Sequence, residues 1–472
     1  MKRKKIHFVG IKGVGMTPLA IIAKEAKCLV TGSDVGDVFI TDESLEKAGI
    51  VPFVGFSRDH VRGADLVITT GAHGGFDNVE VQQAKMEGIP VLTQGQAVGE
   101  FMDGSILKKP FEGISVAGSH GKTTTTAMIA TIFKENKLDP SYVIGTSAIK
   151  FLGQPGHFGK GKYFVAEADE YATEPIHDKT PKLLWQNPRI AVFTNIEFDH
   201  PDLYKTVGDI TKTFLQFANQ LPQNGNLVAC GDDKEIRELL AKYQGERITY
   251  GYSPENDFVI KKVHISGPKT FFYVESGNAS LGEFSLNVVG EHNALNAVAA
   301  MIVALESGLS LDQIKKGLKA FTGTKRRFEF IGNLKSGAYL FDDYGHHPTE
   351  IEKTLKAFKQ SFPDSRLVCI FQPHTYSRTK SLFKEFSHAF SVADTVILID
   401  IYPSQREQPD PTVSSRLLVE QMHTFTKDVL YLPGNADVVK YINNQNFTEN
   451  TVIVTMGAGD IYKINQELPL KK

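Results

Sequence analysis

Apolar residues occur in two kinds of pattern along the chain. Short apolar runs, typical of strands buried on both faces, are followed by glycine-containing turns and then by apolar residues at helical spacing. In the N-terminal part these runs are 6–9, 28–34, 64–70 and 90–92, and a helix is predicted over 19–26. This succession of strand, turn, helix and strand predicts a Rossmann-like parallel sheet.

The same succession returns in the middle of the chain. A strand is predicted from the run 111–114 and a helix over 127–133, and two more buried strands over 163–166 and 189–194. From 257 to 288 the pattern changes to short strands of alternating polarity. Such alternation is typical of β-strands.

A third stretch of α/β pattern begins after Gly323. Its strands are predicted over 338–343, 366–371, 395–400 and 451–456. The sequence therefore predicts an α/β protein with three domains, which we delimit as residues 1–108, 109–322 and 323–472.

Composition excludes several classes of protein. With 472 residues, 41% hydrophobic and 22% charged, the chain has the composition of a globular protein. Its formal charge of −2 argues against a general nucleic-acid-binding surface, which would be basic. The sequence contains no run of 18 consecutive apolar residues, so no membrane span is predicted. Cys28, Cys230 and Cys369 lie far apart, which indicates reduced thiols in a cytoplasmic protein.

The strand predicted from the run 111–114 leads into the stretch 115–126, which contains a candidate phosphate loop. Glycine lets the backbone N–H groups of such a loop approach phosphate oxygens, and the following helix adds its positive N-terminal end. Lys122 would neutralise the β- and γ-phosphates, and Thr123 would bind magnesium. We therefore expect a P-loop-type central domain that binds a nucleoside triphosphate. Its candidate nucleotide-binding residues are Gly118, Ser119, His120, Gly121, Lys122, Thr123 and Thr124. An ordinary strand-to-helix turn is the alternative, because Val116 stands where the general nucleotide-loop pattern has glycine.

Acidic residues follow two neighbouring strands of this domain. Glu167-Ala168-Asp169-Glu170 follows the strand over 163–166, and the run 197–202 follows the strand over 189–194. Strand carboxyl ends are where ligands bind in open α/β sheets, and carboxylates suit Mg²⁺. For a single one of these acids a solvated loop carboxylate is the alternative, but the cluster predicts a metal site.

The turn over 10–16 follows the first strand, and Asp34 lies at the end of the second. This arrangement suits a dinucleotide, so an NAD-dependent oxidoreductase is one hypothesis. That hypothesis explains nothing after residue 110. A regulatory nucleotide-binding module would not need acids at two strand ends. The turn indicates a phosphate or sugar site without identifying the nucleotide.

Together these motifs resemble those of the Mur ligases of peptidoglycan precursor synthesis over nearly the whole chain. The matching segments are Gly-Ser-His-Gly-Lys-Thr-Thr-Thr (118–125), Glu-Ala-Asp-Glu (167–170), Thr-Asn-Ile-Glu-Phe-Asp-His (194–200), His-Asn-Ala-Leu-Asn-Ala (292–297), Arg-Arg-Phe-Glu (326–329), Asp-Asp-Tyr-Gly-His-His-Pro-Thr-Glu (342–350), Phe-Gln-Pro-His-Thr-Tyr-Ser-Arg-Thr (371–379), Asp-Ile-Tyr-Pro-Ser (400–404) and Gly-Ala-Gly-Asp-Ile (457–461).

The resemblance implies an ATP- and Mg²⁺-dependent ligase that forms an amide through an acyl phosphate. Its N-terminal domain would bind a UDP-sugar and its central domain would bind ATP. Its Rossmann-like C-terminal domain would close over the site. The implied catalytic residues are Lys122, Glu167, His200 and Arg327. Thr123, Glu167 and His200 would hold magnesium, and Asn293, Asn296 and Asp343 would contact the nucleotide.

The resemblance also implies the substrates. The N-terminal turn becomes a site for the UDP diphosphate, with Gly13, Gly15, Met16, Asp34 and Thr70 as candidate residues. The substrates would be UDP-N-acetylmuramate and L-alanine, joined at the lactyl carboxylate, with no nucleic acid or membrane insertion. We expect a monomer or weak homodimer.

Two departures from the family pattern bear on this reading. Lys12 stands where the N-terminal turn usually has its second glycine, and the segment after Glu170 is several residues longer than in alanine-adding members. That segment is more like the recycling ligases, which attach L-Ala-γ-D-Glu-meso-diaminopimelate to the same nucleotide sugar. The C-terminal motifs favour L-alanine, and we expect His374, Tyr376 and Arg378 to form its pocket.

Overall fold

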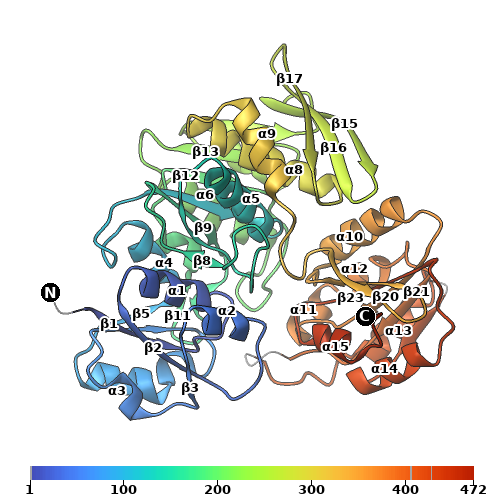
Figure 1. Cartoon of the computed structure of the whole chain (residues 1–472), viewed down its shortest axis with the longest axis horizontal. Helices are drawn as coiled ribbons and strands as arrows, with labels where there is room; N and C mark the ends of the chain where they lie inside the picture. Colours follow the sequence, from blue (N-terminus) through green and yellow to red (C-terminus); the bar gives the residue numbers. More distant parts are fainter. Residues whose placement is uncertain (1–2, 404–406, 427, 472) are drawn as a thin grey trace. The chain divides into compact units, whose positions relative to one another are not determined.

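The computed structural model describes residues 3–403, 407–426 and 428–471 (Figure 1). The chain forms two compact units. The first comprises Met1–Val263, Phe271–Asn287 and Asn293–Thr324, and the second comprises His264–Thr270, Val288–His292 and Lys325–Lys472. The predicted α/β class is confirmed by three sheets that are mostly parallel. The three domain boundaries remain predictions.

The N-terminal sheet has the strand order β3-β2-β1-β4-β5, with every pairing parallel. Its order reverses between β1 and β4, which makes their carboxyl ends the expected ligand crevice. The strands are β1 (Lys5–Val9), β2 (Leu29–Asp34), β3 (Phe53–Val54), β4 (Leu66–Thr69) and β5 (Val91–Thr93). The helices are α1 (Thr17–Glu25), α2 (Asp42–Lys47), α3 (Val79–Met86) and α4 (Gln94–Met102), with short 3₁₀ helices η1 (Arg58–Val61) and η2 (Gly75–Asp77).

The central sheet has the strand order β17-β16-β15-β14-β13-β12-β6-β9-β7-β8. The strands are β6 (Glu112–Ala117), β7 (Ser141–Val143), β8 (Gly156–His157), β9 (Tyr163–Ala168), β12 (Ile190–Phe193), β13 (Asn226–Cys230), β14 (Arg247–Gly251), β15 (Phe258–Ser266), β16 (Lys269–Ser276) and β17 (Ala279–Leu286). The helices are α5 (Lys122–Glu135), α6 (Val207–Ala218), α7 (Lys234–Leu240), α8 (Glu291–Glu306), α9 (Leu311–Ala320) and the 3₁₀ helix η3 (Lys182–Trp185). A separate antiparallel pair joins β10 (Ala172–Glu174) and β11 (Asp178–Pro181).

The hydrophobic pattern predicted β4 and β12, whose apolar runs are continuous. Each residue of β4 and β12 is buried, as expected for parallel strands covered on both faces. In β15 exposed and half-buried residues alternate over its second half. Apolar residues of the N-terminal sheet, such as Phe8, share one core cluster with Phe164 and Ala166 of β9. This shared core explains why both regions belong to one compact unit.

The C-terminal sheet has the order β18-β19-β23-β20-β21-β22, parallel except for the β18–β19 pair. Its strands are β18 (Glu329–Asn333), β19 (Tyr339–Asp343), β20 (Arg366–Phe371), β21 (Thr395–Leu398), β22 (Val429–Tyr431) and β23 (Thr451–Met456). Its helices are α10 (Pro348–Ser361), α11 (Tyr376–Ser381), α12 (Phe383–His388), α13 (Ser415–Met422), α14 (Asn435–Asn443), α15 (Ile464–Glu467) and the 3₁₀ helix η4 (Ile461–Lys463).

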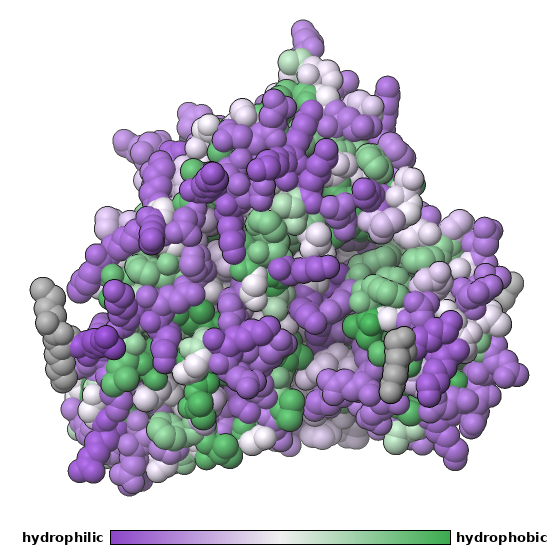
Figure 2. All heavy atoms as spheres, viewed as in Figure 1, coloured by the Kyte–Doolittle hydropathy of each residue, from purple (hydrophilic) through white to green (hydrophobic). Residues whose placement is uncertain are grey.

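Within the described ranges, no helix is both long and apolar enough to cross a bilayer. The face drawn in Figure 2 is mostly hydrophilic, with apolar residues scattered among the polar ones. Cys28, Cys230 and Cys369 are free thiols, as predicted.

Candidate active site

Three neighbouring strands of the central sheet end at the same edge. β12, β6 and β9 are adjacent and parallel, with Ala117 paired with Phe193 on one side and with Ala168 on the other. The segments that leave these strands carry the phosphate loop and both acidic clusters predicted from the sequence. β9 runs two residues further than predicted, so Glu167 lies within the strand.

The loop between β6 and α5 requires glycine at two positions. Gly118 has φ +142°, and a Cβ there would lie 2.0 Å from the Thr194 hydroxyl oxygen. Gly121 has φ +84° and caps α5, and its Cβ would lie 2.6 Å from Asn296 Oδ1. A side chain at either position would collide with a neighbour and strain the backbone. The backbone therefore approaches α8 and the end of β12 closely.

Residues after β12 hold this loop in place. Asn195 Oδ1 accepts a hydrogen bond from the His120 backbone N–H (2.9 Å), and Asn195 Nδ2 donates to the His120 carbonyl (3.0 Å). The Thr194 hydroxyl also donates to that carbonyl (2.5 Å). Sequence reasoning did not assign Thr194 or Asn195 to the site, although they belong to the motif over 194–200. Both side chains contact the backbone of the loop at His120.

Lys122 forms a buried ion pair at the end of β9. Its Nζ lies 2.9 Å from Glu170 Oε2 and donates to the Gly118 carbonyl at 2.5 Å. The two side chains are 15% and 1% exposed. Burial alone would lower the pKa of Lys122, but the Glu170 and Asp169 carboxylates raise it above its ordinary value. The ammonium is therefore a fixed positive charge at the loop.

Glu167 lies beside the first turn of α5. The Thr123 hydroxyl donates to Glu167 Oε2 (2.9 Å), and the Gly145 N–H donates to Oε1 (2.6 Å). Burial raises the pKa of Glu167, against the pull of the Gly145 N–H and of Lys122. Thr123 and Glu167, both predicted metal ligands, are thus in direct contact.

A second group of possible ligands is formed by Asp169, Glu170 and His200. One ligand atom from each lies within 4.8 Å of the others. Burial disfavours ionised Asp169, but Lys182 (2.8 Å) and Lys122 hold the pKa of its carboxyl well below its usual range. Carboxylates that stay ionised are the donors that a divalent hard cation requires, so this group fits magnesium. The sequence placed Asp169 in the acidic cluster without singling it out as a ligand.

His200 is oriented by an aromatic neighbour. Its backbone φ is +55°, and its ring centroid lies 4.6 Å from that of Tyr171. The Tyr171 hydroxyl donates to Asp202 Oδ2 at 2.6 Å. These contacts hold the imidazole next to Glu170, whose Oε1 lies 3.9 Å from His200 Nε2.

The two predicted asparagines share one face of α8. Asn296 Nδ2 donates to Asn293 Oδ1 (3.2 Å), and Asn296 Oδ1 accepts from the Thr125 hydroxyl (3.2 Å). This contact ties the start of α8 to the first turns of α5. The spacing of three residues predicted this shared face.

The residues predicted for the N-terminal crevice differ in their burial and in their contacts. Gly13 and Gly15 lie half-buried in the turn, and Thr70 follows β4. Met16 is 2% exposed and belongs to the core. Asp34 is 1% exposed, and its carboxylate accepts the N–H groups of Lys12 (2.7 Å) and Val35 (2.8 Å). Asp34 therefore organises the turn of this crevice.

The second unit carries two adjacent arginines with different surroundings. Arg326 is buried and its Nε bonds Asp342 at 2.9 Å, whereas Arg327 Nη1 bonds Glu350 at 3.0 Å and its side chain is 27% exposed. Asp343 accepts the N–H groups of Phe328 (2.8 Å) and Gly345 (2.7 Å), and burial raises its pKa to about 6.

The three residues predicted to form the L-alanine pocket lie at the end of β20 and the start of α11. Arg378 is 5% exposed, and its Nη1 donates to the His374 carbonyl at 2.6 Å. The His374 ring stacks on Tyr402 with centroids 5.7 Å apart. Tyr376 begins α11 and is half-buried. Of the motif over 400–404, Ser404 lies outside the described residues.

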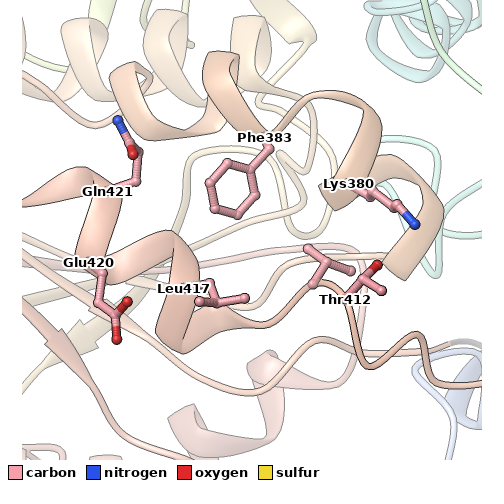
Figure 3. Close-up of a pocket in the computed structure, with 7 residues that line it drawn as sticks. Lys380, Phe383, Thr412, Leu417, Glu420 and Gln421 are labelled. Carbon is pink, nitrogen blue, oxygen red and sulfur yellow. The ribbon is translucent and has the colours of Figure 1, made fainter.

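A cavity of about 440 Å³ lies elsewhere in the second unit (Figure 3). It is lined by Lys380, Phe383, Thr412, Val413, Leu417, Glu420 and Gln421. None of the residues predicted from the sequence lines this cavity. Lys380 forms an ion pair with Asp410 at 2.9 Å.

Family models match along the chain. The Mur ligase family catalytic domain matches residues 5–105, the Mur ligase middle domain matches 116–304, and the Mur ligase glutamate ligase domain matches 326–459. A UDP-N-acetylmuramate–L-alanine ligase from Desulfitobacterium hafniense is 38% identical over 98% of this chain and 99% of its own length. The chain belongs to the Mur ligase family.

Solved structures agree with this assignment. The UDP-N-acetylmuramate–alanine ligase of Thermotoga maritima has a TM-score of 0.79 at 27% identity and covers 98% of this chain and 97% of its own. A murein peptide ligase from Psychrobacter arcticus has a TM-score of 0.71 at 26% identity, with 98% of each chain covered.

We predict that Lys122→Ala lowers kcat by about 100-fold or more, because one positioned charge on a transferring phosphoryl group contributes a few kcal/mol. Lys134→Ala on the same helix is the control, since Lys134 bonds the Leu152 carbonyl (3.0 Å) outside the site. Steady-state phosphate release measures both. If Lys122→Ala kept more than about a tenth of wild-type kcat, the phosphate-loop assignment would be wrong.

A second prediction concerns the acid and imidazole group. His200→Ala should raise the magnesium concentration needed for half-maximal activity by about tenfold, while UDP-sugar affinity stays unchanged. His264→Ala on β15 is the control, because that histidine is exposed. An unchanged magnesium titration would show that His200 has a structural role only.

Proposed function

We propose that the chain is an ATP-dependent ligase of peptidoglycan precursor synthesis. It joins L-alanine to the lactyl carboxylate of UDP-N-acetylmuramate through an acyl phosphate, releasing ADP and phosphate. The observation that carries the proposal is the convergence of the phosphate loop and two acidic clusters at neighbouring strand ends. Full-length similarity to L-alanine ligases supports the choice of substrates.

The chemistry accounts for the charges at these strand ends. A carboxylate is a poor electrophile, so it is first phosphorylated, and the amine then displaces phosphate from the acyl phosphate. Most catalysis of such steps is positioning and neutralisation of charge. Lys122 would take the γ-phosphoryl group in place of its present carboxylate partner. The loop N–H groups and the N-terminus of α5 would hold the remaining phosphate oxygens.

Magnesium fits the donors that lie beside Lys122. Thr123 and Glu167 would hold one ion. The sequence assigned Glu167 and His200 to a second ion, and the grouping of His200 with Asp169 and Glu170 supports these three as its ligands instead. When bound, the ions neutralise phosphate charge. Asn293 and Asn296 would contact the nucleotide, and Arg327 and Asp343 would act from the C-terminal domain.

The amine site would use His374, Tyr376 and Arg378. L-Alanine is a small zwitterion, so its site needs a cation for the carboxylate and little room for the side chain. A planar guanidinium suits a carboxylate because it donates two parallel hydrogen bonds. Arg378 is buried and braced by His374, which argues against a solvated surface charge.

The recycling ligase that attaches a tripeptide to the same sugar is the second candidate. The observation that favours it is the segment after Glu170, which forms β10 and β11. His177 of this hairpin bonds Asp77 at 2.8 Å. The hairpin thus contacts the N-terminal domain, where the UDP-sugar is expected. Similarity to L-alanine ligases over the full length favours L-alanine.

The free thiols suit a reducing compartment, so we also propose a cytoplasmic location. UDP-N-acetylmuramate and L-alanine are the proposed partners, and a monomer or weak homodimer stays a prediction. Neither nucleic acid nor a membrane is expected to bind.

We predict that the enzyme chooses L-alanine when equal concentrations of L-alanine and L-Ala-γ-D-Glu-meso-diaminopimelate compete. A pocket built for L-alanine would be too small for the tripeptide, so the L-alanine adduct should dominate when products are identified by mass. A dominant tripeptide adduct would show that L-alanine is not the acceptor, although the ATP-dependent mechanism would stand.

Arg378→Lys should raise the KM for L-alanine by about tenfold, because lysine cannot donate two parallel hydrogen bonds.

A further inference from the structure

Lys12 occupies a turn position at which a charged side chain is unexpected. It lies between β1 and α1, and its side chain is 12% exposed. Its Nζ donates to the Asp37 carbonyl at 2.8 Å and lies 3.3 Å from Asp42 Oδ1. The ammonium also lies 5.4 Å from the centroid of the Phe39 ring. The side chain is therefore directed toward the start of α2.

The segment over 35–41 joins β2 to α2 and is fixed at both ends. Asp34 precedes it and accepts the Lys12 N–H. At its far end the Thr41 hydroxyl donates to the Lys12 carbonyl, and Asp42 Oδ2 accepts the Phe39 N–H (2.9 Å). Residues 36–38 between these ends are exposed. The Lys12 ammonium reaches this exposed middle through the Asp37 carbonyl.

α2 is itself anchored on the central part of the same unit. The Ser44 hydroxyl donates to the Ser147 carbonyl (2.5 Å), and Gln154 Nε2 donates to the Ser44 carbonyl (3.3 Å). Lys12 thus connects the turn after β1 to a fixed helix. The segment over 35–41 is held between these two points.

This segment borders the expected ligand crevice. In an open parallel sheet the ligand lies beside the turn after β1, and the end of β2 lies next to its nucleoside. We propose that Lys12 is a positioning residue for the nucleotide sugar, whose ammonium holds segment 35–41 as the nucleoside wall of the crevice. The identity of the ligand rests on the proposed function.

The contacts argue against the simpler role of binding the diphosphate. The ammonium already has a carbonyl oxygen and a carboxylate within reach, and it is mostly shielded from water. Turning toward a phosphate would break these charge-assisted contacts and release the segment. The loop that carries Lys122 is held by Asn195 and Thr194 even when its ammonium changes partner, whereas the exposed middle of segment 35–41 would lose its contact with Lys12. We therefore assign Lys12 to the wall rather than to the phosphates.

The test compares binding of uridine and UDP to the full-length enzyme. Lys12→Met keeps the aliphatic stem and removes the charge, while the backbone contacts of residue 12 remain. We expect it to weaken both ligands by the same factor, about tenfold, and Lys12→Arg to restore most of the affinity. Lys24→Met is the matched control, because Lys24 Nζ donates to the Gly49 carbonyl (3.2 Å) in the same domain.

A second readout does not depend on the ligand. Chymotrypsin cleavage after Phe39, followed by mass spectrometry, should accelerate in Lys12→Met and stay unchanged in Lys24→Met. Loss of UDP affinity with uridine affinity unchanged would show that Lys12 binds the diphosphate, and unaltered cleavage would show that it does not hold the segment. Either result overturns the proposal. Accelerated cleavage in an enzyme that binds neither uridine nor UDP would overturn the proposed ligand but not the role of Lys12 in the segment.

Discussion

The buried ion pair between Lys122 and Glu170 is the interaction on which the candidate active site depends. Taking both charges out of water is costly, so each is retained only with a partner in good geometry. Lys122 is the first residue of α5, after the loop that follows β6, and Glu170 follows β9. The ion pair therefore holds the carboxyl ends of β6 and β9 in a fixed position relative to each other. The Gly118 carbonyl completes the contact and holds the loop closed around the ammonium.

The surrounding groups follow from this constraint. Asp169 stays ionised beside the same ammonium with the help of Lys182, and Glu170 brings His200 within reach of both carboxylates. Thr194 and Asn195, which follow β12, fix the loop through hydrogen bonds to His120. Asn296 of α8 lies against Gly121 at the other end of the loop. If a polyphosphate replaced Glu170 as the ion-pair partner of Lys122, the Glu170 carboxylate would become available to bind a cation. Such an exchange of partners would link nucleotide binding to metal binding.

Local patterns predicted much of this arrangement. The buried strands and the glycine loop are recognisable in short segments of sequence, because burial on both faces and positive φ each require particular residue types. The acids at the strand ends are recognisable because they directly follow such strands. The partners of those segments were not predictable. Asn195 meets His120 across 75 positions, Asp34 binds backbone N–H groups in the turn, and the Lys12 ammonium turns to Asp37. Such contacts depend on how the strands are ordered, which hydrophobic periodicity does not specify.

The central claim is that the carboxylate of the sugar substrate is activated by phosphoryl transfer at these strand ends. UDP-N-acetylmuramate labelled with ¹⁸O in both lactyl carboxylate oxygens tests it most directly, with the released phosphate examined by mass. The account predicts one ¹⁸O atom in each phosphate, because the carboxylate oxygen that attacks phosphorus leaves with it when L-alanine forms the amide. Unlabelled phosphate released together with the amide product would contradict the account.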